Sequence, residues 1–187
     1  MKRFMILLLL LGICVSTSEL FSQRAKSLRS TTFLGGEVGL GIPTGDFADA
    51  VNTGFGLNGV LSYFLQRDLL LTGTLGYWSF GKSQGGVDLT FTTIPLNVGL
   101  NYRFGTTNVI PYIGAETFLF FNTANIKYYG VSESDSETKF GFVPLFGFSY
   151  LINPTLEFRG TLKYHIIFTE GSNTTFLGLI LGLHFPI

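Results

Sequence analysis

The sequence is poor in cysteine and in charge, and neither charge sign is in surplus. A lone cysteine, Cys14, excludes an internal disulfide and any site built on paired cysteines. Lysine and arginine together number 12, as do aspartate and glutamate, so no basic field attracts nucleic acid. Charged residues make up 13 % of the chain, against roughly 25 % in soluble domains. An ordinary water-exposed surface is therefore disfavoured.

Long apolar runs are also absent. The longest has twelve residues, starts at Phe4 and follows two basic residues. Such a run is too short for a membrane-spanning helix of about 20 residues, and its basic start is typical of a secretory signal. We expect residues 1–22 to form this signal, with cleavage after Ser22, and residues 23–32 to form a short N-terminal periplasmic segment. The folded domain is expected to occupy residues 33–187.

Beyond residue 32 the sequence alternates between apolar residues and small or polar ones. From Leu156 to Ile166 one parity reads Leu, Phe, Gly, Leu, Tyr, Ile, and the other reads Glu, Arg, Thr, Lys, His. Because side chains on a β-strand point alternately to its two faces, each such segment has one apolar and one polar face. A strand of about 9–11 tilted residues can cross a hydrocarbon layer. The pattern predicts eight strands of this kind, at residues 33–42, 53–65, 69–81, 89–104, 109–122, 138–152, 155–169 and 174–185.

The connections between these strands differ at the two ends of the predicted sheet. Tight turns are expected at one end, at residues 66–68, 105–108 and 153–154. Loops, three of them longer and polar, are expected at the other end, at residues 43–52, 82–88, 123–137 and 170–173. We therefore predict an all-β fold, an eight-stranded antiparallel up-and-down transmembrane β-barrel with both termini on the periplasmic side.

The two faces must be assigned, because a soluble eight-stranded barrel would alternate equally well with its apolar face inside. The polar parity is rich in glycine, which suits a narrow interior and has little reason to cover an exterior. The apolar parity carries aromatics near the strand ends, as interfacial girdles do: Phe55, Tyr63, Tyr77, Tyr102, Phe104, Phe121, Phe140, Tyr150, Tyr164 and Phe185. We therefore place the apolar face toward lipid. Pro95, Pro111 and Pro144 each remove a ladder donor, so we expect bulges or strand ends there.

Three short motifs carry a resemblance to a known family. They are GIPTGDF at residues 41–47, IPLNVGLNYRF at residues 94–104 and IPYIGA at residues 110–115. Together they resemble the small outer-membrane β-barrel domain family, which is related in architecture to the OmpA and OmpX barrels. The resemblance implies a diderm bacterium, an outer-membrane location and a scaffold whose members have adhesive, structural or pore-like roles.

The inward parity also carries charged side chains. A single charge taken out of water is costly, so these groups are expected to pair or to form hydrogen bonds. We predict an interior ion-pair network that fixes the register and plugs the barrel, made of Glu37, Arg103, Glu116, Lys139, Glu157, Arg159, Lys163 and His165, with His184 on the same face. The alternative is a small or gated pore for ions and small solutes, opened by breaking such pairs.

The expected partners follow from the location. They are outer-membrane lipid and the outer-membrane assembly machinery, because the last strand, with Leu181, Leu183 and Phe185, is similar to the C-terminal signal read by that machinery. The barrel is expected to be a monomer and to bind no nucleic acid.

Aromatic residues in otherwise polar loops are candidates for contact with an extracellular or surface-protein partner. These are Phe47, Tyr128 and Tyr129. A lipid-modifying outer-membrane enzyme is a second alternative, but it needs a nucleophile beside a base, and no serine adjoins His165 in the sequence. We therefore expect a structural or surface-interaction role, without enzymatic activity, cofactor or metal.

Overall fold

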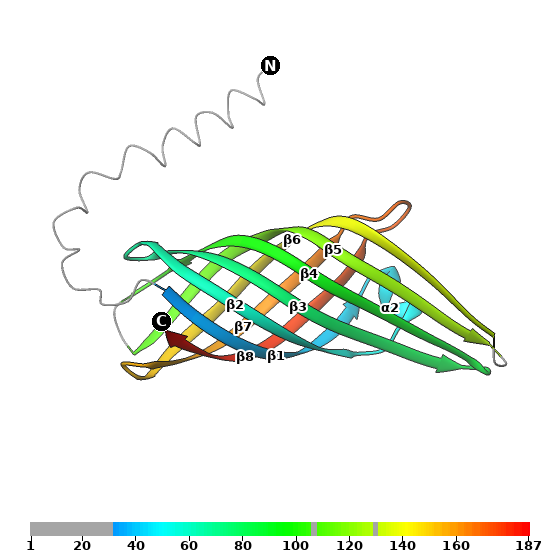
Figure 1. The fold of residues 1–187 in the computed structure, drawn as a ribbon, viewed down its shortest axis with the longest axis horizontal. Helices are drawn as coiled ribbons and strands as arrows, with labels where there is room; N and C mark the ends of the chain where they lie inside the picture. Colours follow the sequence, from blue (N-terminus) through cyan, green and yellow to red (C-terminus); the bar gives the residue numbers. More distant parts are fainter. Residues whose placement is uncertain (1–31, 106–107, 129–130) are drawn as a thin grey trace, which may run out of the picture.

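Eight antiparallel strands close into a barrel in the computed structural model, which describes residues 32–105, 108–128 and 131–187 (Figure 1). Each strand pairs with the next, and the first pairs with the last. The elements are β1 (Thr32–Thr44), α2 (Asp46–Ala50), β2 (Gly54–Gln66), β3 (Leu69–Gln84), β4 (Val87–Arg103), β5 (Val109–Tyr128), β6 (Val131–Asn153), β7 (Leu156–Ile167) and β8 (Thr174–Pro186). The predicted signal at residues 1–22 lies outside the described residues, as does the segment after it up to residue 31.

The two ends of the barrel are built differently. The short connections β2–β3, β4–β5 and β6–β7 lie at one end, together with the start of β1 and the end of β8, at the left of Figure 1. We call this the turn end. The opposite end carries α2, the β3–β4 and β5–β6 hairpins and the β7–β8 connection, and we call it the loop end. No helix among the described residues has the length and apolar character needed to cross a membrane.

The faces are assigned as the alternation predicted. On β1, Leu34, Val38 and Leu40 are more than half exposed, whereas Glu37 between them is buried. The aromatic residues predicted near the strand ends are likewise exposed on the outside. An apolar exterior around a polar and glycine-rich interior is the opposite of a soluble barrel.

The inward glycines make room for large inward side chains. Gly56 pairs with Trp78, and a Cβ on Gly56 would lie 2.3 Å from the Trp78 ring. A Cβ on Gly147 would lie 2.6 Å from the Tyr112 ring. Both distances are far inside van der Waals contact, so the glycines fix where bulky groups fit in the narrow lumen.

The strands at the loop end are longer than predicted. The expected loop at residues 123–137 is mostly a continuation of β5 and β6, and the expected loop at residues 82–88 contains only a tight turn at Gly85 and Gly86, whose φ angles are +61° and +80°. Serine alternates with acidic residues along the start of β6, so apolar periodicity gives no signal there although the ladder continues.

The prolines depart from the expectation of bulges or strand ends. Pro111 does lie near the start of β5, but Pro95 and Pro144 lie inside β4 and β6, where the register is unchanged. Each is paired on one side only: Pro95 with Phe120, and Pro144 with Ala115. On the other side the recorded pairing skips the proline, which accommodates the missing N–H without a bulge. The register shifts of the barrel lie instead between Phe64 and Gln66 and between Leu151 and Asn153, close to the turn end.

Candidate functional site

The barrel interior consists of two layers of different chemistry. The layer toward the turn end and the middle, which we call the polar layer, contains Glu37, Asn58, Ser62, Thr74, Arg103, Tyr112, Glu116, Glu157, Arg159, Thr161, Lys163 and His184. The layer toward the loop end, which we call the aromatic layer, contains Phe47, Trp78, Phe80, Phe120, His165 and Phe176, with the aliphatic residues Val51, Val143, Ile167 and Ile180.

One carboxylate organises the polar layer near the turn end. Glu157 is 1 % exposed and lies between two guanidinium groups. Arg159 Nε donates to Glu157 Oε1 at 2.5 Å, and Arg103 Nη1 and Nη2 each donate to Glu157 Oε2 at 3.3 Å. Arg159 also donates to Ser62 at 3.1 Å, and Arg103 lies over the Phe64 ring at 5.5 Å from its centroid. These charge-assisted contacts cross the lumen from β7 to β2 and β4.

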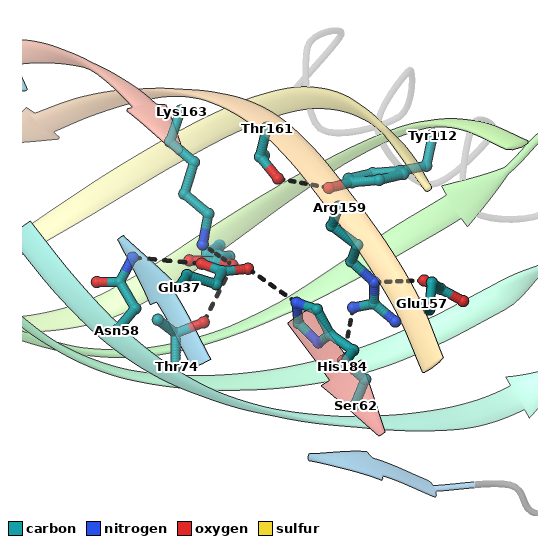
Figure 2. A network of polar contacts seen from close by, with 11 residues as sticks. Glu37, Asn58, Ser62, Thr74, Tyr112, Glu157, Arg159, Thr161, Lys163 and His184 are labelled. Carbon is teal, nitrogen blue, oxygen red and sulfur yellow. Dashed lines mark hydrogen bonds and ion pairs between the residues drawn. The ribbon is translucent and has the colours of Figure 1, made fainter. Parts of the chain in front are cut away.

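Two further carboxylates lie deeper in the barrel (Figure 2). Lys163 Nζ donates to Glu116 Oε1 at 2.7 Å, and Thr74 donates to the same oxygen at 3.2 Å. Glu37 accepts from Asn58 at 3.3 Å and lies 3.3 Å from Nε2 of His184.

The buried charges of the polar layer balance. Its three carboxylates face two guanidinium groups and one ammonium group. A buried charge is tolerated only with a partner, and here each sign is matched by the other. A cavity of about 10 Å³ remains between Glu37, Glu116 and Lys163, about the size that admits one water molecule.

The predicted network is found only in part. Glu37, Arg103, Glu116, Glu157, Arg159 and Lys163 lie together in the polar layer, whereas His165 and Lys139 lie elsewhere. His165 stacks on Phe176 at 4.1 Å between ring centroids, and neither of its ring nitrogens has a hydrogen-bond partner among the described residues. Lys139 lies at the loop end, is 21 % exposed and pairs with Glu137 at 3.0 Å. The alternation shows whether a side chain points into or out of the barrel, but it does not show how high that side chain lies along the barrel axis, because the strands are tilted.

The aromatic layer centres on Trp78, which is fully buried. Its ring lies 5.3 Å from the Phe176 ring and 5.5 Å from the His165 ring, between centroids. Phe80 packs edge-on against Phe176 at 4.9 Å. Sequence reasoning did not single out Trp78, although its place in the inward parity opposite Gly56 is a signal that could have done so.

The short helix α2 covers the aromatic layer at the loop end. Phe47 is 8 % exposed and packs edge-on against Phe80 at 5.3 Å and Phe91 at 5.0 Å. Lys82 Nζ donates to the carbonyl oxygen of Asp49, which holds the helix against β3. Phe47 is therefore not the exposed contact residue predicted from the sequence, because the helix turns its ring into the barrel mouth.

Four strands extend beyond the barrel wall at the loop end, where the β3–β4 and β5–β6 hairpins reach farthest to the right in Figure 1. We call residues 80–84, 87–92, 121–128 and 131–140 the protruding sheet. Its face on the lumen side carries Leu89, Ile126, Tyr128 and Val131 and also the charged residues Glu133, Asp135, Glu137 and Lys139. Its other face is polar apart from Phe121 and Phe140. Tyr128 is exposed but ends β5 and does not lie in a loop as expected, and Tyr129 lies outside the described residues.

The last strand presents its apolar parity outward. Leu181, Leu183 and Phe185 are all exposed on the exterior of β8, which is paired on both sides. A role of these residues in assembly stays a prediction. Among the described residues, no group of three His, Cys, Asp or Glu side chains is placed to hold a metal ion.

Comparison with solved structures finds small outer-membrane barrels. The crystal structure of Neisserial surface protein A has 20 % identity and a TM-score of 0.65, with 84 % of this chain and 98 % of that chain covered. The crystal structure of Ail, the attachment invasion locus protein of Yersinia pestis, has 14 % identity and a TM-score of 0.63, with 86 % and 100 % covered. At such identities the likeness concerns the fold alone.

Comparison with protein families shows, beyond the fold, which family the chain belongs to. No curated protein sequence matches this chain significantly. The family described as outer membrane protein beta-barrel domain matches residues 5–185, which is nearly the whole chain. With its closed ring of eight strands, its apolar exterior and this match, the chain belongs to the outer membrane protein β-barrel domain family.

Proposed function

We propose that the protein is a non-conducting barrel of the outer membrane that presents its protruding sheet to the outside of the cell. In this orientation the turn end and both termini face the periplasm, as in bacterial barrels with short periplasmic turns. The segment at residues 1–22 serves as the export signal, and Leu181, Leu183 and Phe185 serve as the assembly signal. The barrel acts as a monomer, since closure leaves no strand edge within the membrane.

The observation that carries the non-conducting role is the double seal of the lumen. A permeating ion would have to separate the Glu157 pairs in the polar layer and then pass the Trp78 and Phe176 rings in the aromatic layer. The first step leaves buried charges without partners, and the second replaces the ion's water shell with aromatic rings that offer few polar contacts. Both steps are unfavourable, which supports a structural plug over the pore alternative.

Planar-bilayer recording tests this proposal directly. The purified full-length barrel is expected to give no conductance steps, whereas a water-filled porin incorporated in the same bilayer gives them. The double variant Trp78→Ala, Arg159→Ala removes one group from each layer and is expected to leak more ions than the matched control, Gly59→Ala. The control changes only the exterior of the barrel. Reproducible conductance steps from the unmodified barrel would overturn the plugged interior.

A surface-interaction role is supported by the protruding sheet. The structural neighbours include a protein titled as a surface protein and one titled as an attachment invasion protein. In this chain the residues farthest from the barrel are paired strands, which present a fixed surface at low entropic cost. A variant with both hairpins shortened to the barrel rim is expected to keep its fold and lose binding to cells or to surface proteins. Unchanged binding by that variant would contradict the role.

The charge of the loop end restricts the class of partner. One Ail structure contains the heparin analogue sucrose octasulfate. Here the acidic residues of the loop end, Asp46, Asp49, Asp88, Glu133, Asp135, Glu137 and Glu170, outnumber the basic residues Lys82, Lys127 and Lys139. A polyanion would be repelled by this surface, so the charge favours a neutral or cationic partner.

The same interior supports a role without catalysis. Both histidines lie inside the barrel, His184 beside Glu37 and His165 among aromatic rings, away from the lipid-facing surface. An enzyme acting on membrane lipid needs its nucleophile and base where the lipid can reach them. Mass profiles of the outer-membrane lipid, with and without the protein, are expected to be identical. A modified lipid species that requires the protein would contradict this assignment.

A further inference from the structure

The edge of β6 is unpaired over its first part. β6 begins at Val131 and pairs continuously with β5 on one side, from Tyr128 opposite Val131. On its other side, pairing with β7 begins only at Gly141, opposite Ile167. Among the described residues, no strand lies beside residues 131–139 on that side, so their edge N–H and C=O groups are free to pair with another chain.

The side chains along this edge alternate between serine and acidic residues. Ser132 donates to Asn125 at 3.1 Å, and Ser136 lies 3.1 Å from the hydroxyl oxygen of Thr123, so the serine face is tied to β5. The opposite face carries Glu133, Asp135 and Glu137, all exposed. The edge is therefore held extended by its neighbour and presents a row of carboxylates.

Few basic side chains of the protein lie near this row of carboxylates to neutralise it. The residues opposite Glu133 and Asp135 on β5 are Ile126 and Ala124, and neither acid forms an ion pair with another described residue. Lys139 pairs with Glu137 alone. The partner of the edge must therefore supply positive charge if the row is to be neutralised.

A second copy of the chain does not fit this edge. Antiparallel pairing of two such edges centred on Asp135 would put Asp135 opposite its own copy and Glu133 opposite Glu137. Parallel pairing in register would also align like charges. Like charges directly opposite each other destabilise a strand pair, and charged edges are a known means of preventing self-association.

We propose that the β6 edge from Val131 to Lys139 binds an extended peptide segment that carries lysine or arginine at alternate positions. The segment adds a fifth strand to the protruding sheet and places its basic side chains opposite Glu133, Asp135 and Glu137. Next to Val131 it carries an apolar residue, which continues the apolar surface of Ile126 and Tyr128. This inference rests on the proposed surface role and names the chemistry of its partner.

Binding is measured by fluorescence anisotropy with the full-length barrel in nanodiscs of zwitterionic lipid. The probe is a capped nine-residue peptide of alternating lysine and threonine with valine at one end. Glu133→Gln, Asp135→Gln and Glu137→Gln together are expected to weaken binding at least about tenfold, since three cross-strand ion pairs are lost. The control variant, Asp46→Asn with Asp49→Asn, removes charge on α2, which packs beside β1 and β8, and is expected to bind as the unmodified barrel does.

A second peptide separates strand pairing from simple charge attraction. It has the same sequence with N-methyl groups at alternate residues, which keep the charges but block backbone hydrogen bonds. Loss of binding supports the fifth strand, and equal binding overturns it. Equal binding of the first peptide to the unmodified barrel and the triple Gln variant overturns the role of the acidic row.

The cell-binding assay separates this inference from the proposed function. If the shortened hairpins abolish binding to cells while the triple Gln variant retains it, the surface role stands and the cationic-strand inference fails. If the shortened hairpins leave cell binding unchanged, the surface role itself fails. Circular dichroism confirms that the variants keep their β-barrel content, which is expected because all three substituted side chains are exposed.

Discussion

The ion pair between Glu116 and Lys163 offers the sharpest test of a closed polar layer. Both side chains are buried, and their 2.7 Å contact joins β5 to β7 across the lumen. Lys163→Met removes the cation and leaves a buried carboxylate, whereas Glu116→Gln removes the anion and keeps an acceptor for Thr74. The double variant removes both charges and leaves neither group alone.

The expected magnitudes follow from the cost of an unpaired buried charge. Removing one partner of a buried pair costs about 3–5 kcal/mol, whereas replacing both with neutral groups of similar size is close to neutral. Each single variant is therefore expected to lose about 3–5 kcal/mol of unfolding free energy, and the double variant about 2 kcal/mol or less. The exposed pair of Lys139 and Glu137 serves as the control, for which the same cycle is expected to give about 1 kcal/mol or less.

Urea unfolding of the barrel in phospholipid vesicles measures these free energies. The chain has one tryptophan, Trp78, and it lies in the aromatic layer, so its fluorescence reports opening of the lumen. If Lys163→Met alone costs no more than the exposed control pair, water reaches Glu116 and the polar layer is not closed. The double seal would then lose its main support, and the pore alternative would become the better account.

Three other perturbations probe the fit of the interior and the sidedness of the wall. Gly56→Ala puts a methyl group 2.3 Å from Trp78 and is expected to cost about 1–3 kcal/mol in urea unfolding, whereas Gly59→Ala, whose nearest atom would lie at 3.9 Å, is expected to leave the barrel stable. Phe47→Ala uncovers the aromatic layer and is expected to raise quenching of Trp78 fluorescence by acrylamide; unchanged quenching would show that α2 is not a cover. Leu181→Arg puts a charge on the outer face and is expected to cost about 2–4 kcal/mol, and a cost near zero would refute the lipid-facing assignment.

The strands and their sidedness were predictable because period-two alternation is a local property. Burial of one parity and exposure of the other is set residue by residue, so a single sequence contains the information. The glycines of the inward parity strengthened the assignment, and the close approach of Gly56 to Trp78 shows why they are there.

Heights along the barrel were not predictable in the same way. Strand tilt and shear decide which inward residues of distant strands meet, and neither can be read from one strand. Lys163 and His165 share a parity and are two residues apart, yet one lies in the ion-pair network and the other among rings. The β5–β6 extension was missed for a related reason, because a strand outside the membrane needs no apolar face.

One residue of β5, Phe118, departs from the alternation for a reason that the sequence pattern does not indicate. Phe118 belongs to the inward parity of β5, between Glu116 and Phe120, yet it is 44 % exposed. Its φ angle of +153° lies where residues with a side chain are rare. The strained backbone frees the inward position between Glu116 and Phe120, and the ladder with β4 and β6 continues past it without a change of register.

Alternation alone leaves the register of the barrel open to slips of two residues, because such slips keep every face unchanged. A slip of one residue in β7 would expose Arg159 and Lys163 to lipid, at about 2–4 kcal/mol each. A slip of two residues between β2 and β3 exposes no charge, but in one direction it puts Asn58 in place of Gly56 opposite Trp78, where even a single Cβ has no room. The polar layer and the aromatic layer therefore have separate tasks in setting the register: the charges exclude slips of one residue, and the fit of tryptophan to glycine excludes a slip of two residues in one direction.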